Sequence, residues 1–198
     1  MINKHQNIQI IQMIFQHENW ILILVLIWII IYWLWSYWYT SSINNSLYIQ
    51  ECSFIDCFRS SGGGAIYVNA ESNCVLNKIC ACKCNTDSGY SGQFCCILVK
   101  QNSMNMNIAH YVSVCNCSQY ENSNIYGSIY FRNGNISLNN MNSSANRCRY
   151  HSGVYLYYPT ISYTTQSTFS NNTDDHNICI RFYGNSHHMS QCNIIRNH

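Results

Sequence analysis

The pattern that organises this chain is first seen in Cys52-Ser-Phe54-Ile-Asp-Cys57, followed shortly by Ser60-Ser-Gly-Gly-Gly64-Ala-Ile66-Tyr-Val68. It consists of an apolar leader, a run of small turn residues and a short strand in which apolar residues alternate. Glycine tolerates positive φ, so a tight turn into a strand is a natural position for it. Variants of this pattern recur through the rest of the chain, which indicates a repeat protein.

The apolar leaders recur at intervals of 25, 35, 27, 28 and 25 residues. They are Phe54, Ile79, Val114, Met141, Phe169 and Ile194. The long second interval contains residues 85–92 and 102–107, which are natural places for an insertion. The third position after each leader is small or polar, and it predicts one column of stacked residues. This column comprises Cys57, Cys82, Cys117, Ser144, Asn172 and Asn197.

Each unit also has a strand introduced by Gly or Asn after the leader, and most have another apolar strand before it. There is no helical periodicity. These features predict an all-β fold, a short parallel β-helix of about six coils that stack at about 4.8 Å over residues 40–198. The single proline fits, because an interior strand needs its N–H groups for the ladder. A β-sandwich and a disordered Asn/Tyr-rich segment are the alternatives.

The cysteines of the predicted column allow more than one interpretation. Neighbouring members would have Cα atoms about 5 Å apart, within reach of a disulfide, so Cys57–Cys82 and Cys82–Cys117 are mutually exclusive bridges. Cysteine can also pack there as a small apolar residue. Structural zinc sites usually use Cys-x₂₋₄-Cys, whereas Cys80-x-Cys82 and Cys115-x-Cys117 have one intervening residue. Packing or disulfides are therefore favoured over a metal or a reactive thiol, and we predict no metal or cofactor.

An apolar and aromatic segment at residues 20–39 separates a polar leader, residues 1–19, from the repeats. Its 20 residues match the roughly 20 needed to cross a bilayer, and Trp and Tyr crowd one end. The sequence therefore predicts a transmembrane signal-anchor helix. A cleaved signal peptide and a buried core segment are the alternatives. Lys4 precedes the segment and the next basic residue is Arg59, which favours an extracellular or lumenal location for residues 40–198.

Two further features agree with an external location. All 13 cysteines follow the apolar segment, as expected for a region that enters an oxidising compartment. Five Asn-x-Ser/Thr sequons also follow it and are possible glycosylation sites. They are Asn44, Asn116, Asn135, Asn142 and Asn171.

The first repeat resembles a known family. Phe54-Ile-Asp-Cys57 with Gly63-Gly64-Ala65-Ile66 is similar to the paired FxxN and GGA[ILV] repeats of the polymorphic outer membrane proteins of chlamydiae and trichomonads. Phe169-Ser-Asn-Asn172 and Ile194-Ile-Arg-Asn197 match the FxxN half. The resemblance covers about residues 44–198, although Gly-Gly-Ala occurs once. It implies a right-handed, pectin-lyase-like β-helix displayed at the cell surface and linked to adhesion.

The composition limits the chemistry that the chain can perform. Only 9% of residues are charged and the net charge is +2, so there is no polybasic surface for nucleic acid. Glycoside hydrolysis needs two carboxylates at a set separation, but the adjacent Asp174 and Asp175 would point to opposite faces of a strand. We therefore predict a protein that is not an enzyme. A pectin-lyase-like carbohydrate-active enzyme and a degenerate or partial surface protein without activity are the alternatives.

Tyrosines supply the best candidate for a contact surface. They offer rigid amphipathic area of the kind favoured at interfaces, or they form a ladder that stabilises the coils. The residues concerned are Tyr67, Tyr126, Tyr130, Tyr155, Tyr157 and Tyr158. The expected role is structural or adhesive, at a membrane held through residues 20–39, with a protein or glycan ligand on a host or neighbouring cell.

Overall fold

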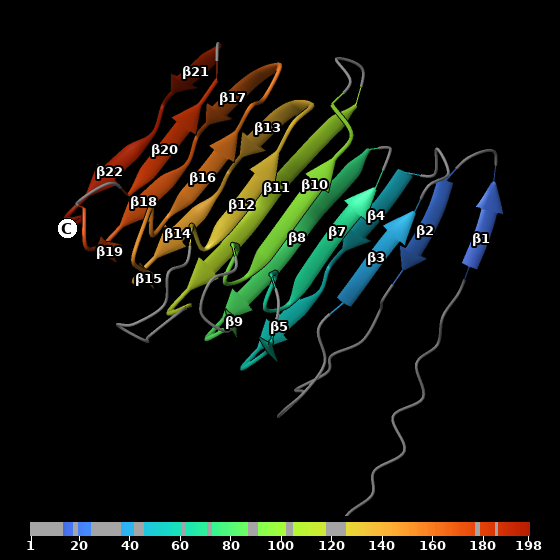
Figure 1. Ribbon diagram of the computed structural model, residues 1–198, viewed down its shortest axis with the longest axis horizontal. Coiled ribbons are helices and arrows are strands. Elements are labelled where there is room, and N and C mark those ends of the chain that lie inside the picture. The colour runs from blue at the N-terminus through green and yellow to red at the C-terminus, as the bar shows by residue number, and fades with distance from the viewer. Residues whose placement is uncertain are drawn as a thin grey trace, which may run out of the picture.

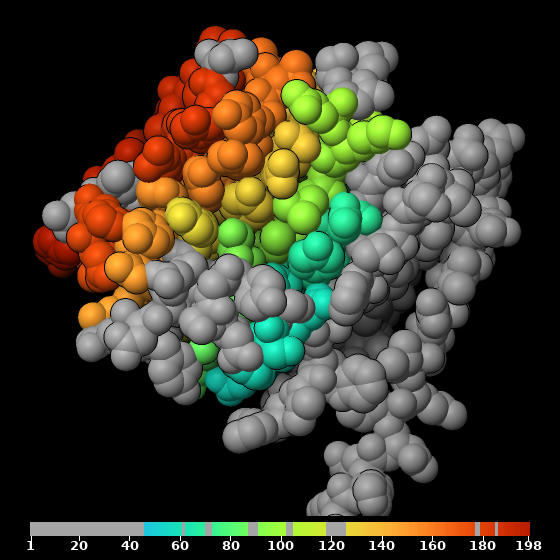
Figure 2. All heavy atoms as spheres, in the orientation of Figure 1, coloured from blue at the N-terminus to red at the C-terminus, as the bar shows by residue number. Residues whose placement is uncertain are grey.

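The computed structural model describes residues 14–17, 20–24, 37–41, 46–60, 62–70, 73–86, 91–101, 105–117, 126–176, 179–184 and 186–198. This part of the chain is all-β and forms a parallel β-solenoid of about five turns, which confirms the predicted fold class (Figure 1). The turns follow one another along the molecule in sequence order, from cyan to red in the space-filling view (Figure 2).

Two parallel sheets run the length of the solenoid. The main path of the first sheet contains β2 (Trp20–Leu24), β4 (Ser46–Gln50), β8 (Cys74–Cys82), β11 (Met106–Cys115), β13 (Asn135–Asn139), β17 (Ile161–Thr165) and β21 (His187–Ser190). The first sheet also includes β5 (Ser53–Ile55), β14 (Asn142–Ser144), β18 (Thr168–Ser170) and β22 (Asn193–Ile195). The second sheet contains β3 (Tyr37–Ser41), β7 (Ile66–Ala70), β10 (Cys95–Val99), β12 (Ile129–Arg132), β16 (Val154–Tyr157) and β20 (Ile180–Tyr183).

Three smaller pairings complete the topology. β1 (Ile14–His17) pairs antiparallel with β2 at the N-terminal end. Between the two sheets, β6 (Phe58–Arg59) pairs with β9 (Asn85–Thr86), and β15 (Arg147–Cys148) pairs with β19 (Thr173–Asp174). The turn that contains β4, β6 and β7 thus passes along the first sheet, through a short third side, and back along the second sheet.

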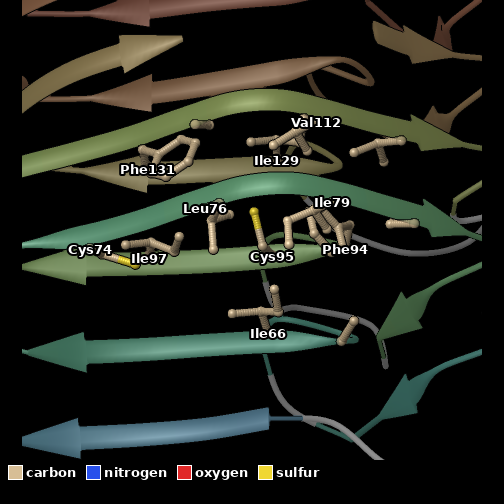
Figure 3. Packing of buried hydrophobic residues seen from close by; sticks show 14 of the residues in the cluster. Ile66, Cys74, Leu76, Ile79, Phe94, Cys95, Ile97, Val112, Ile129 and Phe131 are labelled. Carbon is tan, nitrogen blue, oxygen red and sulfur yellow. The ribbon is translucent and has the colours of Figure 1, made fainter. Parts of the chain in front are cut away.

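The core lies between the two sheets and is filled by the inward side chain of every second strand residue. Figure 3 shows Leu76 and Val112 of the first sheet facing Ile97, Ile129 and Phe131 of the second. Each of these side chains is at most 1% exposed. Because the register repeats from turn to turn, apolar residues of successive turns stack in rows, and their burial provides the main stabilisation of the solenoid.

Two bends in each turn have left-handed backbone conformation at residues other than glycine. The first bend has positive φ at Glu51, Lys78, Tyr111, Asn140, Gln166 and Gln191. The second has positive φ at Asp56, Lys83, Asn116, Ala145, Asn171 and Arg196. Such a conformation is unfavourable for L-residues, and hydrogen bonds to the next turn hold it, as when the Glu51 N–H donates to the Asn77 carbonyl at 3.0 Å.

These bends fix the register. The register shows that two of the predicted leaders, Ile79 and Met141, are not at equivalent positions to the others. Phe54 pairs with Ala81 rather than Ile79, and Val114 pairs with Ser143 rather than Met141. The true intervals between turns are 27, 33, 29, 26 and 25 residues. Ile79 and Met141 are also buried and point inward, because residues two apart share one face of a strand. The bulky side chains of Ile79 and Met141 therefore resemble leaders more closely than Ala81 and Ser143, which occupy the true positions.

The predicted column is corrected in the same way. It contains Cys57, Cys84, Cys117, Asn146, Asn172 and Asn197, each directly after a left-handed residue of the second bend. Cys82 and Ser144 precede that bend and are partly exposed. The bridges Cys57–Cys82 and Cys82–Cys117 are therefore wrong pairings, since Cys82 does not lie in the column.

The asparagines of this column form a ladder of side-chain amides. The backbone N–H of each turn donates to the Oδ1 of the next, at 2.9 Å from Cys117 to Asn146, 3.1 Å from Asn146 to Asn172 and 2.9 Å from Asn172 to Asn197. The Nδ2 groups bond the preceding strand, as Asn172 does to the Ser143 carbonyl at 2.9 Å. The ladder satisfies backbone groups at a bend where the sheet is interrupted.

The described residues leave the predicted membrane segment untested. β2 and β3 lie at its two ends as strands, and residues 25–36 lie outside the described residues. Within the described ranges no helix has the length and hydropathy that a membrane span requires. The polar leader, the segment 20–39 and the boundary at residue 40 therefore stay predictions.

We expect Asn172→Ala to destabilise the protein strongly. Asn172 is fully buried, and its loss removes the ladder bonds and leaves the Asn146 N–H without its acceptor. The free energy of unfolding should fall by about 2–4 kcal/mol, measured by urea denaturation of the full chain. Asn142→Ala, which truncates an exposed asparagine of β14, is the matched control and should cost less than about 0.5 kcal/mol. Equal effects of the two substitutions would contradict the ladder.

Candidate functional site

Tyrosines and arginines gather on the outer surface of the second sheet. Strand alternation places one row outside at Tyr67, Cys96, Tyr130, Tyr155 and Arg181, which are paired in register. A second row follows two residues later at Asn69, Leu98, Arg132, Tyr157 and Tyr183. We call this surface, together with the neighbouring Tyr158 and Arg59, the aromatic face.

The rings of the aromatic face pack against one another from turn to turn. The ring centroids of Tyr130 and Tyr155 are 5.3 Å apart, and those of Tyr157 and Tyr183 are 5.3 Å apart and nearly parallel. Tyr158 meets Tyr183 edge to face at 4.9 Å. Tyr130 and Tyr155 are only 9% and 8% exposed, whereas Tyr158 and Tyr183 are 47% and 40% exposed. Tyr130 and Tyr155 therefore form a buried ladder of rings. Tyr158 and Tyr183 belong to the exposed part of the aromatic face.

A second group of rings extends the aromatic surface at the corner before β16. Tyr126 stacks on Tyr150 with centroids 5.0 Å apart, and Tyr150 stacks on His176 at 4.6 Å. Tyr126 also lies 5.8 Å from Tyr155 and so joins this corner to the aromatic face. The contacts follow from the bridge that pairs Tyr126 with Tyr150 in the next turn.

Arginines lie over four of these rings. The guanidinium carbons of Arg59 and Arg132 are 5.0 Å from the Tyr67 centroid and 5.5 Å from the Tyr157 centroid. Those of Arg149 and Arg181 are 5.4 Å from the Tyr150 centroid and 5.8 Å from the Tyr183 centroid. Such positions allow cation–π attraction. They also hold the planar guanidinium groups against the surface.

The arginines differ in their acidic neighbours. Arg149 lies 4.0 Å from the exposed carboxylate of Asp175. Across the part of the chain that the structure describes, Arg132 and Arg181 have no carboxylate ion-pair partner. Each therefore presents a positive charge on an aromatic surface, available to an anionic group.

Burial keeps the tyrosine hydroxyls of the ladder protonated. It raises the pKa of Tyr130 well above its ordinary value and raises the pKa of Tyr155 to about 12, although Arg132 and Arg181 act in the opposite direction. A hydrogen bond to Tyr183 raises the pKa of Tyr158. At neutral pH the face therefore carries neutral phenols that can donate or accept hydrogen bonds.

All six tyrosines selected from the sequence lie on the aromatic face or the adjoining corner. Sequence reasoning missed Tyr150, Tyr183 and the arginines. Tyr183 and Arg132 could have been found from the strand register, because each lies in an outward row with a chosen tyrosine. Arg149 and Tyr150 belong to a corner for which no strand was predicted.

The remaining predicted repeat residues occupy structural positions. Gly63, Gly64, Ala65 and Ile66 lead into β7, and a Cβ at Gly64 would lie 2.2 Å from the Gln93 carbonyl oxygen. Val114 and Phe169 are buried, Phe54 is half-buried, and Ile194 in the last strand is 58% exposed. None of these side chains belongs to the aromatic face.

The groups considered for catalysis do not converge in the described region. Asp174 is 5% exposed and accepts the His176 N–H at 2.8 Å, whereas Asp175 is exposed beside Arg149. Ser162 lies 2.5 Å from Nδ1 of His187 but is only 1% exposed, so its hydroxyl is not accessible to a substrate. The described residues also include no group of three or more His, Cys, Asp or Glu side chains placed to hold a metal ion.

The predicted sequons differ in accessibility. Asn116, Asn142 and Asn171 are exposed, and Asn116 and Asn171 occupy equivalent positions at the second bend. Asn135 is half-buried within β13, and Asn44 lies outside the described residues. Whether any of them carries a glycan stays a prediction.

Comparison with family models, with curated proteins and with solved structures found no match for this chain. The resemblance to the polymorphic outer membrane proteins therefore stays a prediction. The aromatic face has to be interpreted from its own chemistry.

We expect the hydroxyl of Tyr155 to make stability fall at alkaline pH. Its pKa is raised from about 10 in an exposed tyrosine to about 12, so its contribution is complete below pH 10 and is lost as the pH rises through 12. The difference in unfolding free energy between the wild type and Tyr155→Phe should therefore shrink from pH 10 to pH 12, measured by denaturant titration at each pH. A constant difference would show that the hydroxyl titrates alike in the folded and unfolded chains.

Proposed function

We propose that this chain is a non-enzymatic β-helix module, displayed at a cell surface or secreted, whose aromatic face binds an acidic glycan. The observation that supports this most strongly is the position of Arg132 and Arg181, which lie over the partly exposed ring of Tyr157 and the exposed ring of Tyr183 and have no acidic partner among the described residues. The role is recognition or adhesion rather than turnover.

The shape and spacing of the rings favour a glycan. A pyranose ring presents C–H groups on its faces, and the faces of aromatic rings carry negative charge that attracts such groups. Rings on successive turns repeat at the inter-strand distance of about 4.8 Å, so an extended chain of sugars could lie along the solenoid. The phenol and amide groups of Tyr158 and Asn69 at the surface could bond sugar hydroxyls.

The arginines favour an acidic glycan over a neutral one. A guanidinium group binds a carboxylate or sulfate through two parallel hydrogen bonds, and its planar shape makes this geometry specific. Arg132 and Arg181 lie on adjacent outward rows of β12 and β20. They could therefore contact charges carried by different sugars of one chain.

The setting of the module completes the proposal. The solenoid of about five turns is right-handed, as crossovers between parallel strands almost always are. Residues 20–39 attach it to a membrane or direct its secretion, so that residues 40–198 lie outside the cell or in the lumen. The resemblance to the polymorphic outer membrane proteins, the cysteines that follow residue 39 and the exposed sequons Asn116, Asn142 and Asn171 support this orientation.

A binding experiment tests the ligand. The full-length chain, held by a C-terminal tag, should bind polygalacturonate or heparin and should not bind dextran. Binding should weaken as the salt concentration rises, because the charges are exposed. Arg132→Ala with Arg181→Ala should weaken binding by about tenfold or more, because charge-assisted hydrogen bonds are lost.

Lys78→Gln provides the matched control. It removes one positive charge from the first sheet, and glutamine occurs naturally at the equivalent bend positions 166 and 191. We expect its affinity to stay within about twofold of the wild type, since Lys78 lies in β8 of the first sheet, outside the aromatic face, and pairs with Glu51. The proposal is wrong if no acidic glycan binds, if dextran binds equally well, or if Lys78→Gln weakens binding as much as the double substitution. A protein captured through the same arginines, with no glycan bound, would also contradict it.

A topology experiment tests the setting. With a C-terminal tag on the full chain in a secretory cell, we expect the tag to be accessible to external protease or to be secreted. Glycosidase treatment should increase gel mobility, and substitution of Asn116, Asn142 and Asn171 by Gln should remove most of that shift. A cytosolic tag with no shift would contradict the proposed location.

A further inference from the structure

Two cysteine thiols lie side by side in adjacent turns on the outer surface of the first sheet. They are not part of the aromatic face, which lies on the second sheet. Cys82 ends β8 and Cys115 ends β11, and the two residues are register partners in the parallel ladder. The Cys82 side chain is near enough to that of Cys115 to contribute to the raised pKa of Cys115. Both are partly exposed, and Cys80, two residues before Cys82, shares the same outward face and is exposed.

The neighbouring column of cysteines provides a contrast. Cys57, Cys84 and Cys117 also stack from turn to turn, but each is at most 4% exposed. Thiol–disulfide exchange requires a thiolate that a small disulfide can reach. The interaction with Cys117 and burial raise the pKa of Cys84 well above its ordinary value, although Cys57 acts in the opposite direction. The buried column is therefore protected, and the outer pair is accessible.

We propose that Cys82 and Cys115 are a redox site that exchanges with low-molecular-weight disulfides such as glutathione disulfide and closes to a disulfide between two turns. Register partners in adjacent strands have Cα atoms about 4.8 Å apart, which lies within the range that a disulfide spans.

The exchange takes place in two steps. Burial and the interaction with Cys82 raise the pKa of Cys115 to about 12, so little of the Cys115 thiol is ionised at neutral pH. Cys82 as thiolate attacks one sulfur of glutathione disulfide, the S–S bond breaks, and one glutathione thiolate leaves. Cys115 then loses its proton, attacks the sulfur of Cys82 and displaces the second glutathione. Two protein thiols are oxidised, and one glutathione disulfide is reduced to two glutathione thiols.

The position of the Cys82–Cys115 disulfide means that its formation should stabilise the folded chain. It would join the turns on either side of the longest interval in the repeat, 33 residues, so the chain between Cys82 and Cys115 becomes a closed loop. Closing a loop of this length restricts the unfolded chain. Oxidation should therefore raise the melting temperature of the full chain, and reduction should reverse the rise.

Peptide mapping tests the pairing directly. The full chain is equilibrated with glutathione disulfide, alkylated and digested with trypsin, which cleaves after Lys83 and so separates Cys82 from Cys84. We expect the peptide of residues 79–83 to be linked to the peptide of residues 101–132, with the link assigned to Cys82 and Cys115 by fragmentation. Reduction should release both peptides.

Two variants make the outcome decisive. Cys115→Ser should abolish the link and the rise in melting temperature, whereas Cys80→Ser, which removes the exposed neighbour, should keep both. The proposal is overturned if residues 79–83 stay fully alkylated after exposure to glutathione disulfide, if the link is carried by Cys80 or Cys117, or if Cys115→Ser keeps it. None of these results bears on glycan binding by the aromatic face.

Discussion

The whole solenoid depends on keeping one register from turn to turn. Two left-handed bends in each turn set that register, and residues such as Lys83 and Asn116 accept an unfavourable φ there because their N–H groups bond the next turn, at 3.1 Å in both cases. A shift of one residue would expose every core side chain of a strand. The rows of the core, the asparagine ladder and the aromatic face all follow from this single constraint.

The same register brings equivalent positions of successive turns together even where the residue type changes along the solenoid. Directly after the second bend, early turns have cysteine and later turns have asparagine, and both fill the same buried space. The hydrogen-bond pattern continues where cysteine gives way to asparagine. The Cys117 N–H donates to Asn146 Oδ1, and the Asn146 N–H donates in the same way to Asn172 Oδ1. On the outside of the second sheet, register converts isolated tyrosines into a ladder, and on the outside of the first sheet it places Cys82 beside Cys115.

The sequence alone predicts the fold class, the column of small residues and six members of the aromatic surface, since these depend on local patterns. It misplaces the second and fourth turns by two residues, because apolar side chains two apart are both buried and the bulkier Ile79 and Met141 hide the true positions of Ala81 and Ser143. The contact of Arg132 depends on Tyr157, which is 25 positions away, and the ring under Arg181 belongs to Tyr183, which stacks on Tyr157 of the preceding turn, so no local motif marks the arginines. They become visible only when the turns are stacked.

The central claim is that an acidic glycan lies across the arginines of the aromatic face. Arginine-selective labelling of the full chain by phenylglyoxal, with and without polygalacturonate, tests it at the residues themselves. The account predicts that the glycan protects Arg132 and Arg181 while Arg196, at the second bend of the last turn, is labelled to the same extent in both samples. Equal labelling of Arg132 and Arg181 with and without the glycan would contradict it.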